Sequence, residues 1–144
     1  MQEVTWYNTT RKTEYKESNY QEYDLFLYCG KFDNGATSLR LKAYYYGNDW
    51  IFIDKIQFKN VDGINLYFDV SRNREGDTVY GGSIMEWVDI LVNSEVDNLR
   101  KLLKSKTIYV KLHGKYPREW EMTKEQKTVF KEMLDLYDSL KTIE

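Results

Sequence analysis

Apolar and polar residues alternate along several short stretches of the chain, as in strands that have one face in the core and one in water. The clearest stretch is 39–46, which has an apolar side and a side of tyrosines and cations. Leu39, Leu41, Ala43 and Tyr45 form the first side, and Arg40, Lys42, Tyr44 and Tyr46 form the second. The same alternation predicts strands over 23–29, 64–70 and 107–113, and a short aromatic run predicts a weaker one over 5–7.

A turn of glycine, asparagine and aspartate at 47–49 separates the clearest stretch from a second apolar run over 50–58. These residue types tolerate positive φ, so the turn predicts a hairpin between the two runs. The apolar positions of the second run change phase between Ile53 and Ile56. An inserted residue would restore the phase, which predicts a bulge at 54–55.

Two segments have the three- and four-residue spacing of a helix with one apolar face. The longer is C-terminal, where Thr123 and Gln126 form a capping box ahead of an apolar stripe. The stripe consists of Val129, Phe130, Met133, Leu136, Tyr137 and Leu140. A shorter helix is predicted over 94–104, and residues 83–92 fit either a helix or a strand.

These elements predict an α+β fold. An antiparallel sheet of about five strands runs as a meander, and the C-terminal amphipathic helix and the shorter helix pack on one face. Residues 71–77 show no periodicity and are predicted as an exposed loop, and residues 114–121 are predicted as a loop or an irregular edge. At 144 residues the chain has the size of one domain, 1–144, and in one reading residues 1–22 form a loosely attached N-terminal segment.

Tyrosine is abundant, with 13 residues in the chain, and aromatic residues make up 16% of it. A tyrosine covers apolar surface with its ring while its hydroxyl stays in water, so many tyrosines suit a sheet with one wet face. A stacking platform for bases or sugars is the alternative. Another set either lines a groove or belongs to the core and its rim: Trp50, Trp87, Trp120, Tyr44 and Tyr46.

The formal net charge of −2 gives no general attraction to nucleic acid or to an anionic membrane. The single cysteine, Cys29, cannot form a disulfide within the chain, and no apolar run approaches the length of a membrane span. These features favour a cytoplasmic protein that does not enter a membrane. A secreted or lipid-anchored mature form is the alternative, and residues 8–10 would then be a glycosylation sequon.

Charge is unevenly distributed along the sequence. A basic run occupies 100–118, where no Asp or Glu intervenes, and an acidic stretch over 86–97 precedes it. We predict a binding surface here, suited to an acidic protein patch, a phosphate-bearing ligand or a nucleic-acid backbone. The candidate binding residues are Arg100, Lys104, Lys106, Tyr109, Lys111, His113, Lys115, Tyr116 and Arg118. The alternative is a solvated helix end followed by the wet face of a strand.

Signatures of catalysis and of cofactor binding are missing from the sequence. One histidine and one cysteine cannot build a structural zinc site, the glycine pair at 81–82 lacks the rest of a phosphate loop, and no serine has an esterase-type motif. We therefore expect no metal and no cofactor. The residue types allow one catalytic scheme, phosphodiester hydrolysis, with His113 and Glu86 or Glu119 as acid and base and Arg118 on the phosphate.

Three functions remain open on the sequence. The first is a non-enzymatic binding module that engages another macromolecule, a protein in preference to nucleic acid, through the tyrosine-rich sheet face and the basic run. A small bacterial or phage inhibitor is a special case of it. The second is a phosphodiester hydrolase that uses His113, and the third is a binding protein for a small anionic ligand. A homodimer is also open, because an exposed edge strand makes self-association easy.

Overall fold

A computed structural model describes residues 3–8, 22–79 and 81–142, and within these ranges the chain forms two antiparallel sheets and two α-helices. The five-stranded sheet consists of β1 (Val4–Tyr7), β2 (Glu22–Phe32), β3 (Thr37–Gly47), β6 (Arg74–Thr78) and β7 (Ile84–Leu91). The four-stranded sheet consists of β4 (Lys55–Asn60), β5 (Asn65–Asp69), β8 (Ile108–His113) and β9 (Arg118–Glu121). The helices are α1 (Val96–Leu102), which follows a 3₁₀ turn over Asn93–Glu95, and α2 (Lys124–Thr142).

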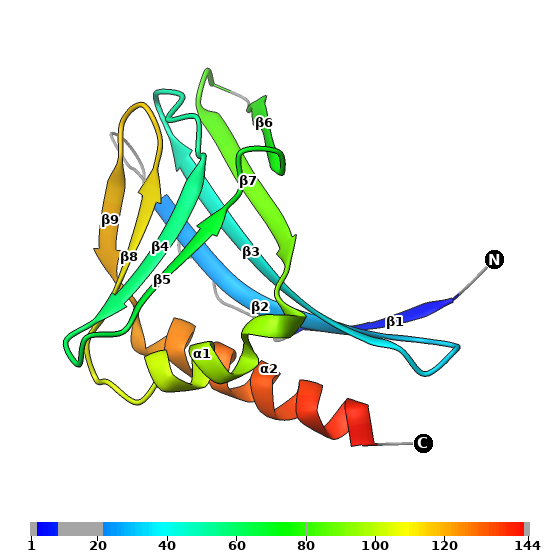
Figure 1. Ribbon diagram of the computed structural model, residues 1–144. Coiled ribbons are helices and arrows are strands. Elements are labelled where there is room, and N and C mark those ends of the chain that lie inside the picture. Colours follow the sequence, from blue (N-terminus) through cyan, green and yellow to red (C-terminus); the bar gives the residue numbers. More distant parts are fainter. Residues whose placement is uncertain (1–2, 9–21, 80, 143–144) are drawn as a thin grey trace.

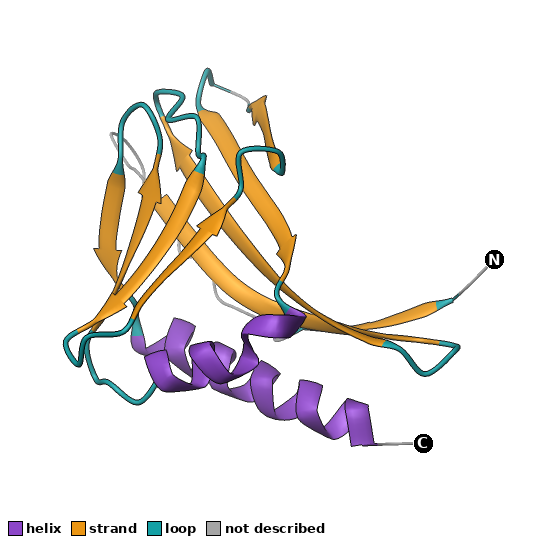
Figure 2. Cartoon of the chain, viewed as in Figure 1, coloured by secondary structure: helices purple, strands orange, loops and turns teal. Residues whose placement is uncertain are grey.

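The two sheets face each other, and both helices lie across one end of them (Figure 1). Figure 2 shows the same division, with the purple helices gathered at one end of the orange strands. The apolar stripe of α2 is buried with the inner residues of both sheets in one continuous core. The α+β architecture and the long C-terminal helix are thus as the sequence predicts.

The two helices differ in whether a side chain caps their first turn. At α2 the predicted capping box is present: Thr123 Oγ1 accepts from the Gln126 backbone N–H at 3.0 Å, and Gln126 Oε1 accepts from the Thr123 backbone N–H at 3.1 Å. The shorter helix α1 is confirmed within the predicted range, and it starts without a side-chain cap. Leu99 and Leu102 on its apolar face are fully buried. Packing therefore decides where α1 begins.

Successive hairpins of the chain alternate between the two sheets. The strand order is β1-β2-β3-β7-β6 in one sheet and β5-β4-β8-β9 in the other. The β2–β3 and β6–β7 hairpins therefore belong to the five-stranded sheet, whereas β4–β5 and β8–β9 belong to the four-stranded sheet. Each connection between hairpins carries the chain from one sheet to the other.

The predicted hairpin around residues 47–49 is wrong. Strand β3 pairs with β2 and β7, whereas β4 pairs with β5 and β8. The segment 47–54 instead crosses between the sheets. The phase change between Ile53 and Ile56 is present, since both side chains are buried. It occurs in the irregular segment 51–54, and the described strand ladders contain no bulge there.

Three further segments become strands. Residues 83–92, open between helix and strand, contain β7, and residues 114–121, predicted as a loop or an irregular edge, contain the edge strand β9. Residues 71–77, also predicted as a loop, contain most of β6, whose residues are all exposed. Because β6 has no apolar residue, no alternation could reveal it. At the N-terminus β1 confirms the short strand over 5–7, while most of the polar stretch after it lies outside the described residues.

A buried carboxylate joins the crossing segment 51–54 to the five-stranded sheet. Glu86 on β7 is fully buried, its Oε2 accepts from the Ile51 backbone N–H at 2.5 Å, and its Oε1 accepts from the Ile53 N–H at 3.1 Å. Ile51 and Ile53 lie between the end of β3 and the start of β4, so their N–H groups belong to neither strand ladder. The side chain therefore supplies the acceptors that a neighbouring strand would supply.

Loss of this carboxylate should destabilise the whole chain. Glu86→Ala leaves two buried N–H groups without acceptors, so we expect the free energy of unfolding to fall by about 2 to 5 kcal/mol. Glu121→Ala, at an exposed position of β9, is the matched control and should cost less than about 0.5 kcal/mol. Urea unfolding measures both, and equal losses for the two variants would contradict a structural role for Glu86.

Candidate functional site

The candidate binding residues of 100–118 do not share one surface. Arg100 on α1 forms ion pairs with Asp135 at 3.0 Å and with Asp138 at 2.6 Å, both on α2. Past the end of α1, the Lys106 carbonyl accepts from Lys127 Nζ at 2.6 Å. This part of the run, which also holds the exposed Lys104, attaches α1 and the following turn to α2.

The middle of the run lies on the outer face of the four-stranded sheet. Tyr109, Lys111 and His113 alternate there with buried residues, as the sequence predicts. Glu121 lies opposite Tyr109 and Glu119 opposite Lys111 on the neighbouring β9. The sheet therefore brings carboxylates of another strand beside the middle of the basic run, although none lies within that run in the sequence.

The end of the run is largely engaged with the backbone around it. Arg118 donates to the carbonyls of Tyr116 and Pro117 at 3.2 and 3.1 Å, and its guanidinium carbon lies 5.9 Å from the centre of the Tyr45 ring. Lys115 Nζ lies 5.5 Å from the centre of the Tyr116 ring. The basic run remains a predicted site, but its cations lie in different parts of the fold. Arg100 lies at α2, Lys111 on the outer face of the four-stranded sheet, and Arg118 beside Tyr45.

Among the residues that the structure describes, no carboxylate is hydrogen-bonded to His113 as the hydrolase scheme needs. Its Nε2 lies 2.8 Å from Gln57 Oε1. Glu86 is in the core of the other sheet with both oxygens bonded, and Glu119 is 3.4 Å from Lys59 Nζ in an ion pair. Partial burial, and then the charges of Lys111 and Lys55, lower the pKa of His113 from its ordinary value.

A second surface stands out on the outer face of the five-stranded sheet, away from α2. We call it the aromatic face. Alternation along β1, β2, β3 and β7 brings to it Trp6, Phe26, Tyr28, Tyr44, Tyr46 and Trp87. The other faces of the same strands carry the core residues against which α2 packs, and Phe26, 4% exposed, is the one buried ring named on the aromatic face. The sheet thus separates a core side from a side rich in rings.

The rings of the aromatic face contact one another across the strands. Trp6 lies 5.4 Å from Tyr28 between ring centres, and Phe26 lies 6.2 Å from Tyr44 in a stacked arrangement. Trp6 is 49% exposed, and Tyr28, Tyr44 and Trp87 are half-buried. This mixture of contact and exposure is typical of amphipathic aromatic side chains at interfaces.

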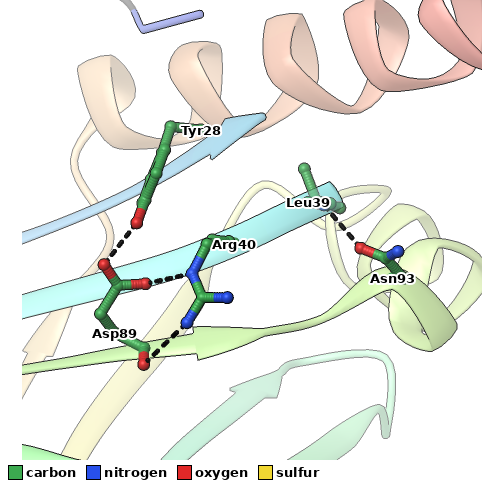
Figure 3. A network of polar contacts seen from close by, with 5 residues as sticks. All are labelled: Tyr28, Leu39, Arg40, Asp89 and Asn93. Atoms are coloured by element: carbon green, nitrogen blue, oxygen red, sulfur yellow. Dashed lines mark hydrogen bonds and ion pairs between the residues drawn. The ribbon is translucent and has the colours of Figure 1, made fainter. Parts of the chain in front are cut away.

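An ion pair with a tyrosine anchors the aromatic face at three strands (Figure 3). Asp89 on β7 accepts from the Tyr28 hydroxyl through Oδ2 and from Arg40 Nε at 2.8 Å through Oδ1. Burial, and then the hydrogen bond and charge of Asp89, raise the pKa of Tyr28 to about 12. The hydroxyl therefore stays protonated at neutral pH, and β2, β3 and β7 are held in register on this side.

The sequence identified part of the aromatic face. Alternation over 39–46 placed Tyr44 and Tyr46 on the wet side of their strand, and the structure confirms that side. Trp87 could not be placed while its segment stayed open between helix and strand. Trp50 and Trp120 lie elsewhere: Trp120 stacks on Tyr23 at 4.7 Å, so the five aromatic residues proposed for a groove do not act as one set.

Other chemistry finds no support in the part of the chain that the structure describes. No cluster of three or more His, Cys, Asp or Glu side chains there is arranged to hold a metal ion. None of the described helices has the length and apolar character needed to cross a membrane.

Searches against protein-family models, curated proteins and solved structures found no match.

The lowered pKa of His113 can be tested directly, because the chain has one histidine. We expect its ring protons to titrate below the ordinary value of about 6.5 in an NMR titration. Since the unfolded chain would bind this proton first, stability should fall as pH drops through that value toward the folded pKa. Lys111→Gln should raise the pKa, and Lys104→Gln should not; a folded pKa above the ordinary value would contradict the assignment.

Proposed function

We propose that the chain is a non-enzymatic binding module that engages another protein through the aromatic face. The observation that carries the proposal is the gathering of partly exposed rings from four strands on the side of the sheet away from α2. Tryptophan, tyrosine and arginine are enriched among the residues that carry the binding energy of protein interfaces. The two aromatic side chains bury much surface at little cost in conformational entropy.

Charge on the aromatic face favours a protein over nucleic acid. Two cations, Arg40 and Lys42, share the face with four carboxylates, from Asp24, Glu75, Asp77 and Asp89. Arg40 is already paired with Asp89, and Lys42 lies opposite the same residue. A polyanion would therefore meet a surface without net positive charge, although stacking of bases on the rings would be possible.

The bonded network of Tyr28, Arg40 and Asp89 supports a rigid surface. Side chains that are already fixed in the free protein lose less entropy when a partner binds. The Arg40 guanidinium donates through Nε to Asp89 Oδ1 and, at 3.4 Å, through Nη2 to the Asp89 carbonyl. Since a guanidinium carries five N–H groups, it keeps further donors. The network can therefore order the face and still offer hydrogen bonds at its centre.

The narrower expectations are part of this proposal. A small bacterial or phage inhibitor acting in the cytoplasm is one form that such a module could take. The basic run, with cations on several sides of the fold, is at most a secondary contact. No specific contact in the described residues favours the hydrolase or the small-anion alternative.

The experiment is a tagged pull-down from a lysate of the source cells, with and without nuclease, followed by titration of any captured protein. Trp6→Ser with Tyr44→Ser removes two rings of the aromatic face and should weaken binding by at least about tenfold. The matched control is Tyr67→Ser with Tyr109→Ser, which removes two exposed tyrosines from the outer face of the other sheet. This control should bind as the parent does.

A third variant reverses the charge of Lys106, Lys111 and Lys115. A protein that survives nuclease and is lost only from the aromatic-face variant supports the proposal. Loss from the control pair or from the charge reversal alone would move the site to the other sheet or to the basic run. Capture that nuclease abolishes would replace the protein partner with nucleic acid.

A further inference from the structure

One residue has a backbone conformation that its side chain disfavours. Phe52, in the segment that crosses between the sheets, has φ of 55°, and it is the one non-glycine residue with positive φ in the described chain. For a bulky side chain this region is a genuine outlier, because Cβ approaches the carbonyl oxygen. Such strain persists only where the surrounding structure enforces it.

The surrounding structure fixes this conformation from both sides. Glu86 accepts from the N–H groups of Ile51 and Ile53, which flank Phe52. On the other side, the Ile51 carbonyl accepts from the Lys115 N–H at 2.8 Å, and Asp54 N–H donates to the His113 carbonyl at 2.9 Å. The strained residue is thus held by bonds to β7 and to the end of β8.

The enforced conformation exposes the Phe52 ring. Ile51 and Ile53 are fully buried, whereas Phe52 is 42% exposed. Its ring stacks on Trp50 with a centroid distance of 6.2 Å and an interplanar angle of 18°. Trp50 in turn packs on Gly76 of β6, where a Cβ atom would run into its ring. The ring of Phe52 is therefore presented on a fixed aromatic base.

A cation completes the arrangement. The guanidinium carbon of Arg74, at the start of β6, lies 5.4 Å from the centre of the Phe52 ring. In the described chain no carboxylate forms an ion pair with Arg74. Arg74 therefore has N–H donors that a carboxylate from outside could use.

This pair is separate from the aromatic face. Arg74 lies opposite Val88 and shares its side of the sheet, the core side, at the edge strand. Glu75, the next residue, faces the other way and accepts from Trp87 Nε1 at 2.9 Å. A partner on Phe52 and Arg74 would thus approach the opposite side of β6.

We propose that Phe52 and Arg74 form an anchor for an acidic segment of a protein partner. A carboxylate of the partner pairs with the Arg74 guanidinium, and an apolar side chain next to it packs on the Phe52 ring. Carboxylates bind guanidinium groups in a bidentate way that a lysine cannot provide. Backbone strain of this kind is concentrated at binding sites, where it holds a side chain ready for a partner.

The first test separates strain from packing. Phe52→Asn places a residue that tolerates positive φ at this position, so we expect its unfolding temperature to equal or exceed that of the parent. Phe52→Val, which tolerates positive φ poorly, should unfold at a lower temperature than Phe52→Asn. If Phe52→Asn unfolds well below both, the ring is part of the monomer's packing and the proposal is wrong.

The second test uses a displayed library of random peptides, selected on the parent chain, with the enriched peptides then synthesised and titrated. We expect peptides with Asp, Glu or a free C-terminal carboxylate beside an apolar residue. Phe52→Asn and Arg74→Gln should each weaken their binding by at least about tenfold. Arg72→Gln, two residues away, is the matched control and should weaken it by less than about threefold.

Each result bears on the proposal. Enrichment of peptides without a carboxylate, equal binding by the two variants and the parent, or no enrichment at all would overturn it. Trp6→Ser with Tyr44→Ser should leave this peptide binding unchanged. The anchor and the aromatic face can therefore fail independently.

Discussion

The buried carboxylate of Glu86 is the interaction on which the arrangement of the two sheets depends. The chain leaves β3, crosses to the opposite sheet and enters β4, and on the way the N–H groups of Ile51 and Ile53 have no strand ladder to supply their acceptors. Glu86 accepts the two N–H groups that this path would leave unbonded in the core. It also fixes the residue between them, so that Phe52 is held exposed and strained while Ile51 and Ile53 are buried.

Local patterns predicted most of the elements but not how the strands pair. Alternation identified β2, β3, β5 and β8, and the capping box and stripe identified α2, because both signals lie within one element. The turn at 47–49 has suitable hairpin residues, yet β3 pairs with β7, some 45 residues further on. Which strands pair depends on how both sheets bury their apolar faces together. A short stretch of sequence cannot show this, because the residues involved are far apart in the chain. Strand β6, with no apolar residue, has no local signal at all.

The candidate sites show the same limit. The basic run is continuous in sequence, but folding sets Glu119 and Glu121 of β9 beside its central strand and pairs Arg100 with α2. The wet side of β3 was predictable from alternation, whereas its extension through Tyr28 and Trp87 required the strand order. The positive φ of Phe52 could not be predicted from the sequence, because phenylalanine does not favour this conformation. It depends on hydrogen bonds from the neighbouring residues to Glu86, which is distant in the sequence.

The alternation of hairpins between the sheets makes the two sheets one folding unit. Each sheet contains two hairpins, with β1 as the fifth strand of the larger sheet, and between the two hairpins in the chain lies a hairpin of the other sheet. Completing either sheet closes a loop that contains strands of the other, so both sheets carry the entropic cost of closing long loops. A cut anywhere between β3 and β8 would separate strands that must pair, which means that neither sheet is a module that recombination could move to another protein on its own.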